Sequence, residues 1–385
     1  MDDRDISRRP ISPLFARRPS LEAASPNERL ILDLLRRERG ASRADLSRIT
    51  GLTNQSLSRI IDDLGGRGLV KLGPSLPKGR GPPSSPVIIC PDGAYTIGVS
   101  LMTDAIAIGL MDFDGQIVCD RIAPLNAADV EAVLGEVRHF IDQVFSERGL
   151  NRDRLLGVGV GITGYFIGEG AKVNPPAQID SWALIDVVEV FERGLNLPVW
   201  MDNDGNVAAV GESLSGVGVD LRSFAYLFFS AGFGGGLIFD RKLYRGIHGN
   251  AGEFASILTF DVMSPNLENL RLSVNRAGHR FDNLAAMLQD FDPDWPGVAE
   301  WIEPAVGALN TVISAISAIV DVEAIVLGGR LPGALAERLI PRLSYVNPER
   351  RKHHRPVPKI LVSAVTQDAA MIGAASLPLK ALFYG

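Results

Sequence analysis

Three short segments bring carboxylates, amides and glycines together at spacings that suit the binding of a small polar molecule. Asp202-Asn203-Asp204-Gly205-Asn206 ends an apolar strand predicted over Val199–Met201 and opens a predicted helix. A carboxylate at a strand end can accept a hydrogen bond from a sugar hydroxyl or act as a base toward it. Ser230-Ala231-Gly232-Phe233-Gly234-Gly235-Gly236 allows the backbone a tight turn and a close approach to a ligand. Gly249-Asn250-Ala251-Gly252-Glu253 adds a second carboxylate after another glycine-containing loop.

Each of these segments also has a simpler interpretation. Asp204 could only cap the helix that it opens, because Asp is a preferred N-cap residue. The glycine-rich segment could only form a hairpin turn. Glu253, taken alone, could be an ordinary surface carboxylate. The local sequence leaves these alternatives open.

Two similar series of elements are predicted to position these segments. The strands have the apolar character of a buried sheet, and each series contains hairpin strands, a helix and a buried strand. Such a duplication predicts an α/β body of two lobes with a cleft between them. The first series is Tyr95–Leu101, Ala105–Met111, Gln116–Arg121, a helix over Ala128–Arg148 and Leu155–Gly161; the second is Tyr226–Ser230, Gly235–Asp240, a helix over Trp301–Asp321 and Ala324–Leu327.

Ahead of this body, the segment from Pro26 to Cys90 has the pattern of a winged helix-turn-helix. Three short helices are predicted after the cap residues Ser25, Ser42 and Thr53. A turn at Thr50-Gly51-Leu52 separates the second helix from the third. The apolar segments Leu69–Leu72 and Val87–Ile89 then predict a hairpin, whose tip Pro77–Gly81 forms a basic wing.

The exposed side of the third helix carries side chains that can reach base edges and phosphates from the major groove. A basic, glycine-containing wing can enter a minor groove or straddle phosphates. The alternative is a three-helix protein-interaction module, but the polar helix face and the basic wing occur together, which favours double-stranded DNA. The predicted DNA-binding residues are Ser42, Arg43, Thr53, Asn54, Gln55, Ser56, Arg59, Lys78 and Arg80.

Charge is distributed unevenly along the 385 residues, whose formal net charge is −6. Residues 1–85 contain 16 Lys and Arg against 10 Asp and Glu, while the remainder contains 23 against 35. A basic head on an acidic body suggests that only the head meets a polyanion. The two cysteines provide neither a disulfide framework nor a zinc set. No run of 18 consecutive apolar residues and no signal-peptide pattern is present, so a cytoplasmic location without membrane contact is expected.

Taken together, the motifs resemble those of the ROK family (repressors, open reading frames, kinases). The resemblance extends from Pro26 to the end of the chain and rests on motifs in family order. It implies an actin-like, hexokinase-like body of two lobes, and the preceding winged helix implies the repressor branch of xylose- and N-acetylglucosamine-type regulators. The motifs are the Asp202–Asn206 string, Ala231–Gly236, Ala251-Gly252-Glu253, Ile325–Gly329 and Gln367–Ala375.

Departures from the family pattern favour a repressor over a kinase. Family kinases carry Asp-Leu-Gly-Gly-Thr-Lys at the first hairpin, where the Asp helps to hold the metal nucleotide. The matching stretch here is Ser100-Leu101-Met102-Thr103-Asp104-Ala105, and the usual Thr of the second phosphate loop is Ala231. Phosphoryl transfer depends on positioning and charge neutralisation, so we expect no catalytic residue, with Asp204 a relict base.

The family's zinc site is also expected to be missing. Its usual His is Ser256 here, and residues 257–290 contain no Cys. A Cys3His tetrahedron therefore cannot form there, and we expect no metal and no cofactor.

The sugar-binding positions of the family are only partly retained. Asn203, Asp204 and Glu253 match family residues that contact sugar hydroxyls. Gln178, ahead of Trp182, is aligned with a family Asn, and His248 is a candidate substitute for the missing His. We therefore expect a small sugar or sugar-like effector whose identity the resemblance does not provide.

These expectations combine into a regulator, most simply a repressor of carbohydrate uptake or catabolism genes that binds a double-stranded DNA operator as a homodimer or dimer of dimers. The alternatives are an active ROK sugar kinase with an accessory DNA-binding head, and a regulator controlled by a protein partner. The expected organisation is a flexible tail over 1–25, the winged helix over 26–90, a first lobe over 91–205 completed by 366–385, and a second lobe over 206–365.

Overall fold

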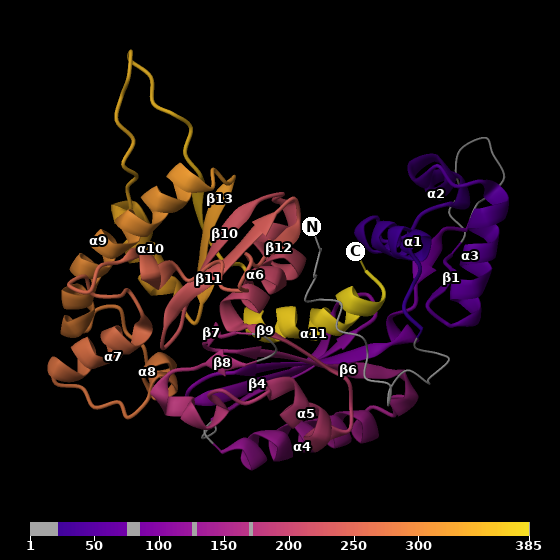
Figure 1. The fold of residues 1–385 in the computed structure, drawn as a ribbon, viewed down its shortest axis with the longest axis horizontal. Helices are drawn as coiled ribbons and strands as arrows, with labels where there is room; N and C mark the ends of the chain where they lie inside the picture. Colours follow the sequence, from indigo (N-terminus) through magenta and orange to yellow (C-terminus); the bar gives the residue numbers. More distant parts are fainter. Residues whose placement is uncertain (1–21, 75–84, 125–128, 169–171, 385) are drawn as a thin grey trace.

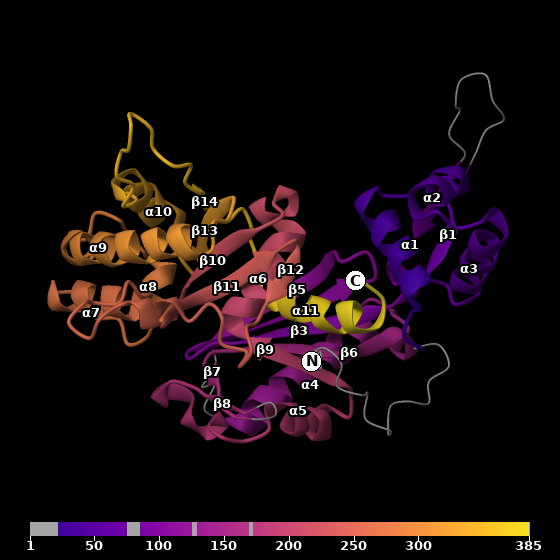
Figure 2. The same cartoon turned by 45° about the horizontal axis from the view of Figure 1, so that its top comes forward.

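The computed structural model describes residues 22–74, 85–124, 129–168 and 172–384. Its N-terminal part is a three-helix unit with a two-stranded sheet, followed by a body built on two larger sheets (Figures 1 and 2). The helices are α1 (Pro26–Arg37), α2 (Arg43–Thr50), α3 (Asn54–Gly66), α4 (Val130–Glu147), α5 (Val187–Leu195), α6 (Asp204–Ser215), α7 (Leu267–Arg276), α8 (Leu284–Gln289), α9 (Pro296–Ile319), α10 (Gly333–Leu339) and α11 (Ala369–Leu382).

The predicted caps of the first three helices are confirmed. Ser25 forms a capping box with Glu28, and the Ser42 and Thr53 hydroxyls accept hydrogen bonds from Asp45 N and Ser56 N. These bonds satisfy backbone donors that a helix start leaves unpaired, which is why each helix begins where it does. The predicted hairpin is also confirmed, because β1 (Val70–Leu72) pairs antiparallel with β2 (Val87–Ile89).

The two sheets of the body have the same topology, as the predicted duplication requires. In each, an antiparallel hairpin and its third strand lie on one side, and two parallel strands lie on the other. The first sheet has the order β5 (Ile117–Pro124), β4 (Ala105–Asp112), β3 (Tyr95–Leu101), β6 (Leu155–Ile162), β9 (Val199–Asn203); the second has the order β12 (Lys242–Tyr244), β11 (Phe233–Phe239), β10 (Phe224–Phe229), β13 (Ala324–Gly329), β14 (Lys359–Val362). A small hairpin pairs β7 (Tyr165–Phe166) with β8 (Val173–Asn174).

Helices cover both faces of each sheet. α4 and α5 pack on the outer face of the first sheet, and α7, α9 and α10 pack on the outer face of the second. α6 and α11 lie between the sheets (Figure 1). Their backbones approach so closely that a Cβ added at Gly373 would lie 1.7 Å from the Val207 carbonyl oxygen. The contact between α6 and α11 therefore depends on glycine.

α9 is long and apolar enough, by length and composition alone, to cross a membrane. It is also more extensive than the helix predicted over Trp301–Asp321. Its side chains Trp301, Leu309 and Ile313 are buried in the core of the second lobe, beneath β10 and β13. This burial is that of a core helix in a globular protein.

Candidate ligand-binding cleft and nucleic-acid interface

Asn203 and Asp204, where β9 ends and α6 begins, have different roles. Asn203 is the N-cap of α6, and its side-chain oxygen accepts hydrogen bonds from Gly205 N at 2.8 Å and Asn206 N at 3.3 Å. Asp204 is the first residue of the helix, so capping is not its main role. Its side chain is one of those that line the cleft between the lobes. The alternative that Asp204 only caps the helix is therefore not what the geometry shows.

The Asp204 side chain is almost completely buried. Its side chain accepts a hydrogen bond of 2.5 Å from the Thr163 hydroxyl, and its residue is only 7% exposed. Burial raises the pKa of Asp204 to about 6, against the opposing effect of the Thr163 and Gly205 hydrogen bonds. A carboxylate in this setting is ionised at neutral pH but incompletely solvated, so it is a strong acceptor for a ligand hydroxyl.

An ion pair between the lobes holds the end of β9, directly before Asp204. The Arg245 guanidinium, which follows β12, donates to the buried Asp202 carboxylate at 2.6 Å. The other oxygen of Asp202 accepts from Asn203 N and from the Asn206 amide, each at 2.9 Å. The first motif is thereby attached to the second lobe, and sequence reasoning missed Arg245 because no local pattern marks it.

The glycine-rich segment Ser230–Gly236 forms a turn at the cleft and continues into β11. Ser230, Ala231 and Gly232 form the turn of the β10–β11 hairpin and line the cleft. Gly235 and Gly236 lie within β11, where a Cβ at Gly235 would meet the Tyr226 carbonyl oxygen at 1.8 Å and one at Gly236 the Ala209 Cβ at 2.7 Å. These two glycines therefore serve the close packing of β11, and Gly235 also lines the cleft.

Glu253 reaches the same cleft from the second lobe. Its loop is attached to the first lobe by Asn250, whose side chain accepts from Phe166 N at 2.7 Å and donates to Phe166 O at 2.9 Å. Burial, and then the nearby Asp204 charge, raise the pKa of Glu253. Glu253 is thus not an ordinary surface carboxylate.

The cleft has a volume of about 450 Å³, which is in the range of small-molecule sites. Asn203, Asp204, Gln178 and Glu253 all line it, as expected from the sequence. His248 does not: it is exposed, on a loop whose neighbour Gly249 turns through a left-handed conformation against Phe166. Lining residues that sequence reasoning missed are Thr163, Tyr165, Asn174, Phe228 and Phe233.

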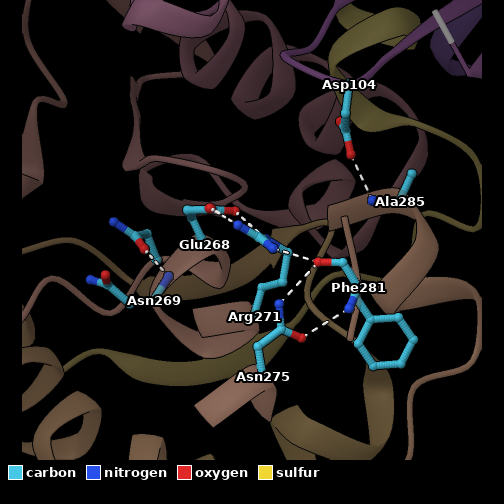
Figure 3. A network of polar contacts seen from close by, with 8 residues as sticks. Asp104, Glu268, Asn269, Arg271, Asn275, Phe281 and Ala285 are labelled. Carbon is cyan, nitrogen blue, oxygen red and sulfur yellow. Dashed lines mark hydrogen bonds and ion pairs between the residues drawn. The ribbon is translucent and has the colours of Figure 1, made fainter. Parts of the chain in front are cut away.

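A second interlobe ion pair lies where β3 turns into β4. The Asp104 carboxylate accepts from the Arg330 guanidinium at 2.7 Å and from Ala285 N at 2.6 Å, and both charged side chains are mostly buried. Figure 3 shows Asp104 above the start of α8. The loop before α8 is fixed in turn, because Phe281 is bonded to Arg271 and Asn275 of α7. Met102 is buried in the same turn.

Within the described ranges, no group of three or more His, Cys, Asp or Glu side chains could hold a metal ion.

Binding at this cleft should depend on pH. A ligand hydroxyl that donates to ionised Asp204 loses this acceptor as the carboxyl is protonated. Because the pKa of Asp204 lies at about 6, we expect the dissociation constant to increase severalfold between pH 7 and pH 5. Calorimetric titration with a sugar found by thermal-shift screening measures this, and a constant affinity over that range would contradict it.

The candidate DNA-binding residues that the structure describes lie at the start of α2, at the start of α3 and on α3. Asn54, Gln55 and Arg59 are exposed on α3, and no ion pair of Arg59 is seen in the described structure. Arg43 is exposed but lies 3.6 Å from Asp62. The Ser42, Thr53 and Ser56 side chains take part in the caps of α2 and α3. Lys78 and Arg80 lie outside the described residues.

The winged helix is packed against the body rather than tethered to it. Arg29 of α1 donates to three carbonyl oxygens at the end of α11 and beyond, at 3.0 Å to Lys380, 2.7 Å to Ala381 and 2.8 Å to Tyr384. Phe383 lies in one continuous core with Leu32 and Leu35 of α1. α11 thus runs from the space between the lobes to the DNA-binding unit (Figures 1 and 2).

Fold and site together define a winged helix-turn-helix joined to a two-lobed, actin-like body with a polar cleft. Residues 96–261 match the ROK family and residues 25–81 match the MarR family. The chain therefore carries a ROK family domain behind a winged helix of MarR type.

Three curated relatives illustrate the range of similar proteins. An uncharacterized protein of Sinorhizobium fredii is 27% identical over 374 residues, which are 95% of this chain and 94% of the relative. The xylose repressor of Bacillus subtilis is 28% identical over 62% of this chain and 62% of its own length. A glucokinase of Streptomyces coelicolor is 32% identical over 42% of this chain and 49% of its own. The alignments thus cover less than two thirds of both named proteins.

Among solved structures, a ROK family transcriptional regulator described as a homologue of the E. coli MLC protein superposes with a TM-score of 0.66. It is 20% identical and covers 93% of this chain and 96% of its own. This likeness concerns the fold, and it includes the winged helix as well as the body.

Proposed function

We propose that this protein is a transcriptional regulator, acting as a repressor of carbohydrate uptake or catabolism genes, whose operator affinity is changed by a sugar or sugar-like ligand. The observation that carries the proposal is the direct packing of α1 on the end of α11, a helix that lies against both lobes of the cleft. The similarity to a xylose repressor supports the same function.

The proposed coupling needs two arrangements of the lobes with different affinities for the ligand. Asn203 and Asp204 come from the first lobe, while Glu253 comes from the second. A ligand held by all three would favour one separation of the lobes. Because α11 lies between them, its position would change with that separation and move the winged helix. Two winged helices in a cytoplasmic homodimer or dimer of dimers would then change their spacing on DNA.

We further propose that the cleft is catalytically inactive. The family resemblance places nucleotide phosphates at the turn between β3 and β4. Here this turn is joined to the end of β13 by Asp104 and Arg330, and Met102 is buried in it. A buried ion pair of this kind is costly to open, because each partner would be left without its counter-charge.

The rival function is that of an active kinase, which the similarity to a glucokinase and the position of Asp204 in the cleft support. A coupled ATPase assay over a hexose panel tests it. We expect no sugar-dependent turnover above background, with a bacterial glucokinase as the positive control. Turnover that disappears in Asp204→Asn would show the protein to be a kinase.

DNA binding is tested through Arg59. Arg59→Ala removes an exposed cation from α3, so we expect weaker binding to a duplex selected by the wild-type protein from a random library. If Arg59 contacts a phosphate, the slope of log K against log salt should fall by about 1. Arg37→Ala is the matched control, because Arg37 is exposed on α1. Equal binding by both variants and the wild type would exclude α3 as the recognition helix.

The third candidate function is that of a regulator controlled by a protein partner, in which the cleft no longer binds a ligand. If this is correct, no sugar or sugar phosphate should stabilise the protein in thermal-shift screening.

A further inference from the structure

Between α10 and β14 the chain leaves the second lobe as a narrow projection, which we call the basic arm (residues 344–358; Figure 1, upper left). Cross-links hold its two sides together. The Tyr345 hydroxyl donates to Pro358 O at 2.9 Å, and the Asn347 amide donates to Arg355 O at 2.9 Å. Nearer the tip, the backbones of Arg350 and His353 exchange hydrogen bonds of 2.9 and 3.0 Å. The arm is therefore an ordered hairpin.

The tip of the arm is a two-residue turn made of cations. Arg351 and Lys352 both have left-handed backbones, with φ of 53° and 63°. Positive φ at both central residues is the geometry of the tight hairpin turns that usually contain Asn-Gly. Lysine and arginine adopt a left-handed backbone less readily than Asn or Gly. The turn geometry alone therefore does not explain why these two residues occupy the tip.

Charge at the tip contrasts with the body that carries it. Residues 350–355 read Arg-Arg-Lys-His-His-Arg, whereas residues 86–385 as a whole contain 35 Asp and Glu against 23 Lys and Arg. Arg355 folds back onto Ser317 O. Arg350, Arg351 and Lys352 are exposed, and none has a carboxylate partner within the part of the chain that the structure describes.

The arm and the winged helix rise from opposite ends of the body on the same side, and both views agree on this (Figures 1 and 2). We propose that the tip of the basic arm, Arg350, Arg351 and Lys352, binds the phosphate backbone of duplex DNA flanking the site held by the winged helix. The inference rests on the proposed DNA-binding function. Duplex DNA presents a regular row of charges beyond the winged helix, and cations at the tip offset the repulsion between that DNA and the acidic body.

The test uses the full-length protein and a duplex selected from a random library by the wild type, in two lengths. One is trimmed to the segment that the winged helix protects, and the other is extended on both sides. The variant Arg350→Gln/Arg351→Asn/Lys352→Gly removes three charges but supplies the turn with its preferred residues. The matched control Lys242→Ala/Arg276→Ala/Lys359→Ala removes three charges elsewhere on the body.

On the extended duplex we expect the arm variant to bind about tenfold or more weakly at low salt. The slope of log K against log salt should fall by about 2 to 3, as expected for lost phosphate contacts. On the trimmed duplex the arm variant should bind like the wild type. The control variant should bind both duplexes like the wild type.

Unchanged affinity of the arm variant for the extended duplex would overturn the inference. If Arg59→Ala still weakened binding in that case, the proposed function would stand without the arm. A changed oligomeric state in sedimentation, with unchanged DNA affinity, would assign the tip to a second copy of the chain and also overturn the inference. If the wild type selects no duplex at all, the proposed function itself fails.

Discussion

Asp204→Asn is expected to weaken the binding of sugar strongly while making the unliganded protein more stable. The ionised side chain is 7% exposed, and its pKa is raised to about 6 by burial, so the fold bears a cost for keeping it charged at neutral pH. An amide of the same size removes that cost, on the order of 1–3 kcal/mol by the size of the shift. It also removes the charged acceptor for a ligand hydroxyl, and we expect an affinity loss of about 10- to 100-fold.

The stability gain should itself depend on pH. The folded-state pKa lies above that of an unfolded Asp, so between about pH 4 and pH 6 the folded protein holds a proton that the unfolded chain has lost. The contribution of Asp204 to stability is therefore present below about pH 4 and is lost as the pH rises through 6. The melting temperature of Asp204→Asn should exceed that of the wild type at pH 7 and approach it at pH 4.5.

Thermal denaturation with and without a stabilising sugar measures both effects of Asp204→Asn. Asp220→Asn, at an exposed position, is the matched control and should leave both unchanged. A variant that binds sugar with the affinity of the wild type, or that is less stable than the wild type at pH 7, would contradict this account of Asp204.

Arg29→Ala is expected to detach the winged helix from the body. The Arg29 side chain joins α1 to three carbonyl oxygens at the end of the chain and also donates to Ala24 O. Loss of this guanidinium leaves several partly buried carbonyls without a partner, at about 1–3 kcal/mol each in the least favourable case. We expect destabilisation of about 3 kcal/mol or more, seen as a separate low-temperature transition of the winged helix in calorimetry.

The same variant tests the proposed coupling. If α11 carries the movement of the lobes to α1, Arg29→Ala should still bind DNA, yet its DNA affinity should no longer change with sugar. Arg37→Ala, on an exposed position of α1, should keep both the single transition and the sugar response. A sugar response that survives in Arg29→Ala would show that the signal takes another route.

Local sequence was sufficient for the parts of the fold that depend on neighbouring residues. The caps Ser25, Ser42 and Thr53 fixed where three helices start, because each hydroxyl accepts from a backbone N–H three residues ahead. Strand Tyr95–Leu101 was predicted with its observed limits. The limits of a helix were less accurate where no side-chain cap marks its start. The helix predicted over Trp301–Asp321 begins at Pro296.

By itself, the sequence determined the class of the elements that it predicted, the order of the two repeated series, and Asn203, Asp204 and Glu253 as candidate residues, which line the cleft. Only the tertiary structure decided which residues far apart in the sequence make polar contacts with one another. Arg245 meets Asp202 and Arg330 meets Asp104 over separations of 43 and 226 residues, and Arg29 reaches Lys380 over 351. His248, near Glu253 in sequence, is outside the cleft. The reason is that periodicity and capping act over a few residues, whereas long-range ion pairs depend on how complete sheets and helices pack.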